Sequence, residues 1–262
     1  MSLIPRPSVC GHRGHCIDAP ENTLAAFAAA ADVGGDRCEI DTVLSKDGEI
    51  VVLHDLLLDR TTNGHGAAAD RTAAEIAALD AGSWFGARFA GEQVPTLRAA
   101  LAFARSRGMT YEVEIKERRN TEAYLERLKD ILSDPADRAI CTMISFDHAS
   151  LLAAKRLIPD IKTGGIVLER YPDPVALARM SELDELCIDL DPFTLEAGER
   201  LKHEGIAMRV HAYSPAALEK ARQAGLGWEA KLAAALEADL LDIVSSDDVR
   251  WAAEFARMHP PR

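Results

Sequence analysis

Short runs rich in β-forming residues alternate along this chain with longer alanine-rich segments, and no other sequence feature restricts the fold as strongly. The eight expected strands cover residues 8–12, 37–44, 111–116, 139–144, 161–167, 185–190, 207–213 and 241–245. Expected helices lie between them at residues 23–32, 96–107, 121–133, 149–157, 174–182, 195–203 and 215–224. Because helix follows strand throughout, the pattern predicts βα units around a parallel sheet. The length of 262 residues suits a closed (β/α)8 TIM barrel, which takes about 250.

Residues 48–95 interrupt this alternation. The turn Lys46-Asp47-Gly48 carries an Asp-Gly pair typical of a hairpin, so residues 51–53 are expected to pair back on the strand at 37–44. A glycine-punctuated loop and a short helix near 72–79 follow. We therefore expect a small insertion at about 48–95, between the second and third barrel strands. The sequence contains no internal repeat and no Pro/Ser-rich linker, so residues 1–262 are expected to form one domain.

The composition excludes several classes of protein. A hydrophobic fraction of 48% rules out a disordered chain. The formal net charge of -12 repels polyanions, so nucleic acid and anionic membranes are not expected partners. A small anionic substrate stays possible, because a metal or a few basic groups can reverse the potential inside one pocket.

The amino-terminal sequence and the cysteines indicate a cytoplasmic protein. No basic segment followed by a long apolar run opens the chain, and no apolar stretch approaches the length of a membrane span or stable anchor. The cysteines are odd in number, scattered and without CxxC spacing, which favours reduced thiols in the core over disulfides or a zinc knuckle. They are Cys10, Cys16, Cys38, Cys141 and Cys187.

Acidic residues gather on two expected barrel strands. Glu39 and Asp41 flank Ile40, so the period of two places both carboxylates on one face of the strand. Glu112 and Glu114 repeat the pattern on the third barrel strand. The active site of an eight-stranded barrel lies at the carboxyl ends of its strands. Carboxylates that face one pocket repel one another unless a cation lies among them, and an all-carboxylate set favours Mg²⁺ or Ca²⁺ over zinc.

Histidine and basic residues end the same strands. The first strand runs into His12 and Arg13, the apolar run at 51–53 is followed by His54, and Lys116 ends the third barrel strand. Imidazole titrates near neutral pH, so two histidines can exchange the roles of acid and base between two steps. Together with a metal and basic side chains, they indicate acid–base chemistry on an oxyanion.

Six short motifs follow one another in the first half of the chain. They are His12-Arg13-Gly14, Pro20-Glu21-Asn22-Thr23, Glu39-Ile40-Asp41, Lys46-Asp47-Gly48 with Val51-Val52-Leu53-His54-Asp55, Arg60-Thr61-Thr62, and Glu114-Ile115-Lys116. Together they resemble the glycerophosphodiester phosphodiesterase family. The resemblance is dense from residue 9 to residue 116 and thinner afterwards, where Ser145-Phe146 is the clearest match.

The resemblance implies a (β/α)8 catalytic domain that hydrolyses a small glycerophosphodiester to glycerol 3-phosphate and an alcohol. It implies a divalent cofactor, Mg²⁺ or Ca²⁺, and attack on phosphorus by a glycerol hydroxyl before water opens a cyclic phosphate. The implied metal ligands are Glu39, Asp41 and Glu114. The implied acid–base pair is His12 and His54, and the implied phosphate-binding residues are Arg13 and Lys116.

Three further positions are weaker candidates for the second shell or the substrate pocket. Glu21 lies beside the His12 loop and is expected to orient it. His211 stands where the family commonly has tryptophan, so it either contacts the substrate or only hydrogen-bonds Asp189 or Asp191. Asp191, together with Asp189 at the end of the sixth strand, is expected to approach substrate hydroxyls.

Two other functions remain open on the sequence. One is a phosphodiesterase that cleaves a lysophospholipid in the manner of lysophospholipase D, although the acidic balance and the missing anchor count against it. The other is a non-catalytic barrel that acts as a binding protein, which conflicts with the complete set of polar site residues. Alanine-rich helix faces permit close subunit packing, so a homo-oligomer is possible.

Overall fold

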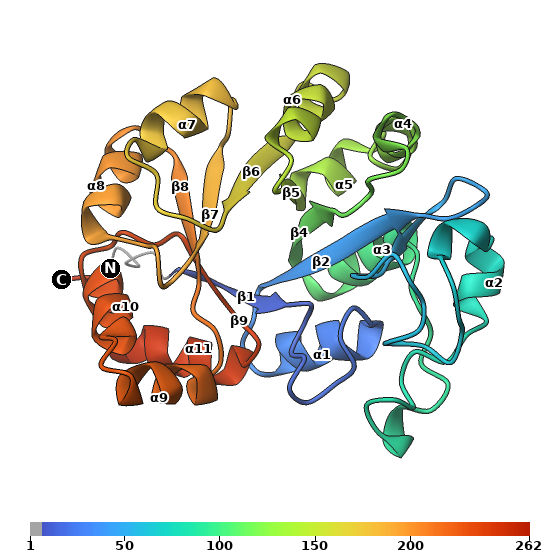
Figure 1. Ribbon diagram of the computed structural model, residues 1–262, viewed down its shortest axis with the longest axis horizontal. Coiled ribbons are helices and arrows are strands. Elements are labelled where there is room, and N and C mark those ends of the chain that lie inside the picture. The colour runs from blue at the N-terminus through green and yellow to red at the C-terminus, as the bar shows by residue number, and fades with distance from the viewer. Residues whose placement is uncertain (1–6) are drawn as a thin grey trace.

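The computed structural model describes residues 7–262 and contains a closed barrel of eight parallel strands with helices around it (Figure 1). The barrel strands are β1 (Ser8–His12), β2 (Arg37–Leu44), β4 (Thr110–Ile115), β5 (Cys141–Ser145), β6 (Lys162–Val167), β7 (Glu185–Asp189), β8 (Ala207–His211) and β9 (Ile243–Ser246). Neighbours pair in the order β1-β9-β8-β7-β6-β5-β4-β2, and β2 pairs with β1 to close the ring. The predicted (β/α)8 fold is confirmed.

Helices cover the outside of this ring (Figure 1). They are α1 (Leu24–Asp32), α3 (Leu97–Arg107), α4 (Thr121–Ile131), α5 (Pro135–Ala139), α6 (His148–Leu157), α7 (Pro174–Met180), α8 (Leu195–His203), α9 (Pro215–Gln223), α10 (Trp228–Glu237) and α11 (Val249–Met258). Side-chain hydrogen bonds cap the first turn of several of these helices; Thr23 caps α1 and Thr96 caps α3. Their apolar faces pack on the strands in one continuous core that includes Phe27, Tyr111 and Leu201.

The insertion stands beside the carboxyl end of β2 (Figure 1). Its strand β3 (Ile50–Val52) pairs antiparallel with β2, as the Asp-Gly turn predicts. The capped helix α2 (Ala73–Ala77) and the short 3-10 turns at Ala68–Asp70 and Ala87–Phe89 complete it. A separate apolar cluster that includes Leu58, Ile76 and Val94 fills it. The insertion therefore holds a fixed position against β2.

Several predicted strands differ from the structure at their ends, and for two of them a single residue explains the difference. The strand predicted from residue 139 begins at Cys141, because Asp134 caps α5 and Pro135 occupies its first turn, which takes Ala139 into the helix. The strand predicted to reach residue 213 ends at His211, since Tyr213 has a φ of 60°, in the left-handed region.

The inside of the barrel below the strand ends is charged. Glu112, fully buried, lies 2.6 Å from Arg209 Nε and 3.4 Å from an Arg37 nitrogen. We expected Glu112 to face the same pocket as Glu114, but it lies one layer deeper and pairs with these arginines. A buried carboxylate without such partners would be strongly destabilising, and the two guanidinium groups supply the compensating charge.

Several expectations concern the chain as a whole. All five cysteines are free thiols; Cys10, Cys38, Cys141 and Cys187 are buried. Among residues 7–262, no helix combines the length and the apolar character that crossing a bilayer requires. The first residues, over which we expect no signal segment, lie outside the described part of the chain.

Candidate active site

The backbone of the turn after β1 packs closely against itself and against α1. A β-carbon on Gly11 would lie 2.7 Å from the Gly14 carbonyl oxygen, and one on Gly14 would lie 2.7 Å from Ala26 of α1. Arg13 between them has a φ of 58°, which a residue with a side chain rarely adopts. The strained turn directs the Arg13 backbone N–H to Glu39 Oε2 at 3.1 Å. It thus fixes His12 and Arg13 against the acidic residues of β2.

Strand register brings three acidic residues together at the carboxyl ends. Glu39 is the register partner of His12 on β1, and Asp41 is the partner of Glu114 on β4. One oxygen from each of Glu39, Asp41 and Glu114 lies within 4.8 Å of the others, and all three residues are buried. The alternation on β2 and β4 therefore does produce one acidic cluster.

Burial and neighbouring charges shift the pKa values of all three carboxylates. Burial, with Asp41 next in effect, raises the pKa of Glu39 well above its ordinary value and that of Glu114 to about 7. Burial also acts to raise the pKa of Asp41, but Arg13 and Lys116 hold it below its usual value. Glu114 Oε1 is buried and accepts no hydrogen bond from the described residues, although Lys116 Nζ lies 2.9 Å away. A hard divalent cation fits this donor set of buried carboxylate oxygens.

Two basic side chains border the acidic cluster. Arg13 Nε lies 3.2 Å from Asp41 Oδ2, and Lys116 Nζ lies 3.4 Å from Asp41 Oδ1. Asn22 adds an amide donor to Asp41 Oδ2 at 2.8 Å and accepts from the Asp41 backbone N–H. Asp41 is thus held on three sides. The orientations of Arg13 and Lys116 follow from it.

His54 and Arg13 are joined by a chain of charged groups. His54 Nδ1 lies 2.6 Å from Asp55 Oδ1. Arg60, from the insertion, donates through a forked pair to Asp55 and through a second pair to Glu21, with its four donor–acceptor distances between 2.7 and 3.1 Å. Glu21 Oε1 accepts from Arg13 at 2.9 Å. We expected Glu21 to orient the His12 loop, and the structure shows it binding Arg13 and Arg60. The pKa of Asp55 lies near 2, chiefly because of Arg60, so its carboxylate stays ionised beside His54.

His12 contacts two groups that come late in the chain, from β8 and from the turn after β9, which lie near β1 in the ring of strands. Its Nδ1 lies 2.7 Å from Asp247 Oδ1, in the turn after β9. Its ring centroid lies 4.7 Å from that of His211 on β8. Both His12 and His54 therefore have an aspartate at Nδ1, which leaves Nε2 free for proton transfer. Their side chains are 28% and 29% exposed, so each reaches solvent-accessible space.

A cavity of about 260 Å³ opens above these groups. Its polar lining comes from His12, Glu39, Glu114, Asp189, Arg209, His211 and Tyr213. Its apolar lining comes from Ile144, Phe146, Ile166 and Leu168 on β5, β6 and the residues after them. One cavity thus offers a charged side and an apolar side.

The weaker candidates divide between this cavity and its surroundings. His211 lines the cavity and lies 3.5 Å from Ser245 Oγ, so it is not limited to hydrogen bonds with Asp189 or Asp191. Asp191 is not among the lining residues, and its carboxylate accepts from Trp228 Nε1 at 2.9 Å. Of the two aspartates that we expected to approach the substrate, only Asp189 lines this cavity.

Sequence reasoning missed three residues of this neighbourhood as candidates: Arg60, Arg209 and Asp247. Asp247 directly follows a barrel strand, and that position was the available signal. Arg60 stands in a motif shared with the family but gives no sign of its two partners. Arg209 precedes His211 by two residues, so the period of two on β8 turns both toward the barrel interior.

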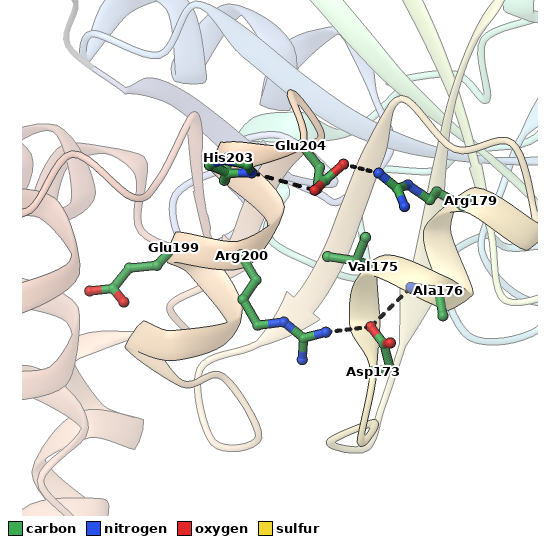
Figure 2. Close-up of a pocket in the computed structure, with 8 residues that line it drawn as sticks. All are labelled: Asp173, Val175, Ala176, Arg179, Glu199, Arg200, His203 and Glu204. Atoms are coloured by element: carbon green, nitrogen blue, oxygen red, sulfur yellow. Dashed lines mark hydrogen bonds and ion pairs between the residues drawn. The ribbon is translucent and has the colours of Figure 1, made fainter.

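A second cavity, of about 440 Å³, lies between α7 and α8 (Figure 2). Its charged side chains face one another: Arg200 pairs with Asp173 at 2.7 Å, and Arg179 pairs with Glu204. These ion pairs lie between helices on the outer surface of the barrel, and each charged group in them has a partner of opposite charge. The acidic cluster at the strand ends is therefore the stronger candidate for catalysis.

Known sequences match this chain over most of its length. The model of the glycerophosphoryl diester phosphodiesterase family matches residues 12–228. A glycerophosphodiester phosphodiesterase of Caldanaerobacter subterraneus subsp. tengcongensis is 40% identical over 161 residues, 60% of this chain and 65% of that protein. One of Bacillus subtilis is 30% identical over 196 residues, 69% of this chain and 66% of that protein. The matched region thus spans about two thirds of these relatives.

Solved structures match almost the whole chain. A phosphodiesterase of Oleispira antarctica, solved with the product sn-glycerol-3-phosphate, has a TM-score of 0.82 and 28% identity, and the match covers 96% of this chain and 97% of that one. A glycerophosphodiester phosphodiesterase of Agrobacterium tumefaciens has a TM-score of 0.73 and 25% identity, with 96% and 99% covered. From the family match, supported by these structures, we conclude that this chain belongs to the glycerophosphoryl diester phosphodiesterase family.

Proposed function

We propose that this protein hydrolyses small glycerophosphodiesters to glycerol 3-phosphate and an alcohol, with a divalent metal ion as cofactor. The observation that carries the proposal is the buried cluster of Glu39, Asp41 and Glu114 with two aspartate-held histidines beside it. The family and the product bound to the Oleispira antarctica relative support this reaction. We further propose that residues 1–262 act as one catalytic domain in the cytoplasm.

Glu39, Asp41 and Glu114 would hold the metal ion, Mg²⁺ or Ca²⁺. When bound, the ion would polarise phosphate oxygens and neutralise charge that develops on them. The raised pKa of Glu39 and of Glu114 supports this assignment, because a cation among the three would favour their ionised forms. Arg13 and Lys116 lie at the same cluster and would bind the remaining phosphate oxygens, Arg13 through its donor fork and Lys116 as a point charge.

His12 and His54 would share the proton transfers. In the first step the glycerol 2-hydroxyl attacks phosphorus, one imidazole Nε2 takes the hydroxyl proton, and the other protonates the oxygen of the departing alcohol. A cyclic glycerol phosphate results. In the second step water attacks phosphorus and the two histidines act in reverse, which gives glycerol 3-phosphate. Asp247 and Asp55, at the two Nδ1 atoms, fix the tautomer and stabilise each imidazolium in turn.

A second candidate, cleavage of a lysophospholipid, is favoured by the apolar side of the cavity. Phe146 and Leu168 line it and are 41% and 59% exposed. Such side chains would accept an acyl chain at lower free-energy cost than water would.

The deciding experiment measures release of glycerol 3-phosphate from glycerophosphocholine, glycerophosphoethanolamine and glycerophosphoglycerol, and of choline from lysophosphatidylcholine. Each substrate is tested with EDTA and then with Mg²⁺, Ca²⁺ or Mn²⁺ restored. We expect release from the small diesters that EDTA stops and a divalent ion restores. Faster cleavage of the micellar lipid would favour the second candidate, and no turnover with any ion would favour a binding protein.

Arg60 provides a test of the network that joins the two halves of the site. In Arg60→Met the forked contacts to Asp55 and Glu21 are lost, so His54 and Arg13 are less well oriented. We expect kcat to fall by about 10–100-fold, the usual effect of removing an outer-shell partner, and KM to rise because the proposed phosphate-binding residue Arg13 is less well oriented. Added guanidinium should restore part of kcat. Arg105→Met, which removes an exposed pair on α3, is the control, and an unchanged kcat in Arg60→Met would contradict the role.

A further inference from the structure

Three metal-binding side chains meet beside the acidic cluster but do not belong to it. One ligand atom from each of His12, His211 and Asp247 lies within 4.8 Å of the others. They come from β1, β8 and the turn after β9, which are neighbours in the barrel although far apart in the chain. The proposed hydrolysis uses His12 and Asp247 and leaves His211 without a role.

The chemistry of this second set differs from that of the first. Glu39, Asp41 and Glu114 offer only oxygen, which suits Mg²⁺ or Ca²⁺. Two imidazoles and one carboxylate suit zinc, and a zinc ion with three protein ligands keeps a fourth position for water. Both histidines line the cavity, so that position would face it.

His211 is prepared to act as a ligand. It is half-buried, and its ring centroid lies 4.7 Å from that of His12. Its Nδ1 lies 3.5 Å from Ser245 Oγ, a long contact, and its Nε2 makes no hydrogen bond within residues 7–262. A neutral imidazole with a free nitrogen is what a metal ion requires.

The surrounding charges permit a cation here. Arg209 is the nearest positive group on β8, and it pairs with Glu112 at 2.6 Å. Asp247 is the acidic member of the set, and its Oδ1 lies 2.7 Å from His12 Nδ1. The thiol of Cys16 lies 3.6 Å from Asp247 Oδ1 and adds a soft group beside the set.

We propose that His12, His211 and Asp247 form a second metal site, selective for zinc-class transition ions, and that its occupation stops hydrolysis. The ion would take the place of the hydrogen bond between His12 and Asp247, whose proton leaves to the other ring nitrogen or to solvent. A metal-bound His12 exchanges no proton with substrate. The inhibitory half rests on the proposed function, whereas binding rests on the geometry alone.

Calorimetric titration with Zn²⁺ tests the binding without using activity. The protein titrated is the double variant Glu39→Gln and Glu114→Gln, which lacks the all-carboxylate set. We expect one Zn²⁺ per chain, and we expect His211→Asn in that background to weaken binding by at least about 100-fold, since a ligand matters more than the outer-shell partners whose loss costs about 10–100-fold. Asp247→Asn should do the same. His203→Gln, at an exposed histidine on α8, is the control and should leave affinity unchanged.

Two further readouts make the test decisive. Co²⁺ in the same double variant should give an absorption spectrum with histidine ligation that disappears in His211→Asn. In the unaltered protein, Zn²⁺ should suppress Mg²⁺-supported turnover even in excess Mg²⁺. The residual turnover of His211→Asn should not be suppressed by Zn²⁺.

Zinc affinity that is the same with and without His211 would overturn the site. Zinc bound through His211 without loss of turnover would overturn the inhibition. A protein inactive on every diester would refute the proposed function and leave the titration to decide the site.

Discussion

Replacing Glu39 or Glu114 with glutamine is expected to lower metal-supported turnover by on the order of 10³-fold or more, because each removes a proposed ligand. Glutamine keeps the size of the side chain, so the barrel is expected to stay folded. Burial raises the pKa of Glu114 from 4.5 to about 7, so without metal the free energy of unfolding falls as the pH rises through this interval. A neutral glutamine avoids that loss. The variants should therefore melt no earlier than the metal-free parent.

The measurement is turnover of a glycerophosphodiester over a range of Mg²⁺ and Ca²⁺ concentrations, together with the melting temperature with and without each ion. The ion should raise the melting temperature of the parent but not of the variants, since ligands stabilise only what they bind. Glu254→Gln, an exposed position on α11, is the control. Undiminished turnover in a folded Glu39→Gln protein would remove this residue from the ligand set.

Replacing His12 or His54 with alanine is expected to lower kcat by roughly 10²–10⁴-fold each, the range of a lost general acid or base. The double variant should be only slightly slower than either single one, because the two act in one proton-transfer sequence. In the proposed mechanism substrate binding would depend mainly on Arg13, Lys116 and the cavity, so KM should change little.

Single-turnover kinetics with saturating metal separate these effects from product release. Added imidazole should restore part of the rate of each alanine variant, which a misfolded protein would not allow. The control is His203→Ala, at a side chain 85% exposed on the outside of the barrel. If either alanine variant retained full kcat, the acid–base pair would have to include a different residue, and Asp189 or His211 would be examined next.

The fold could be predicted from the sequence because the hydrophobic patterns that indicate strands and helices involve neighbouring residues. The strands β1 and β2 and the helix α8 have the bounds that the hydrophobic pattern predicts. Two of the errors at strand ends arose where one residue decides the boundary: Asp134 starts a helix by capping it, and Tyr213 ends the strand by adopting a positive φ. The exact residue at which a helix or strand begins or ends depends on contacts beyond the local hydrophobic pattern.

The acidic cluster was also accessible, since alternation along a strand places Glu39 and Asp41 on one face and the barrel brings strand ends together. The same rule failed for Glu112, which has the same spacing from Glu114 and yet pairs with Arg37 and Arg209 inside the barrel. Depth along a strand depends on the stagger of neighbouring strands, which no single strand's sequence records.

The sequence by itself determined the succession of strands and helices, the insertion after β2, and the residue types at the strand ends, because helix and strand periods are properties of neighbouring residues. Only the tertiary structure decided which groups meet. Closure of the barrel sets Asp247 against His12, and the insertion carries Arg60 to Glu21. Such pairs join residues far apart in the chain, and a hydrogen bond tolerates only a few tenths of an ångström, so they exist only once the whole barrel is packed.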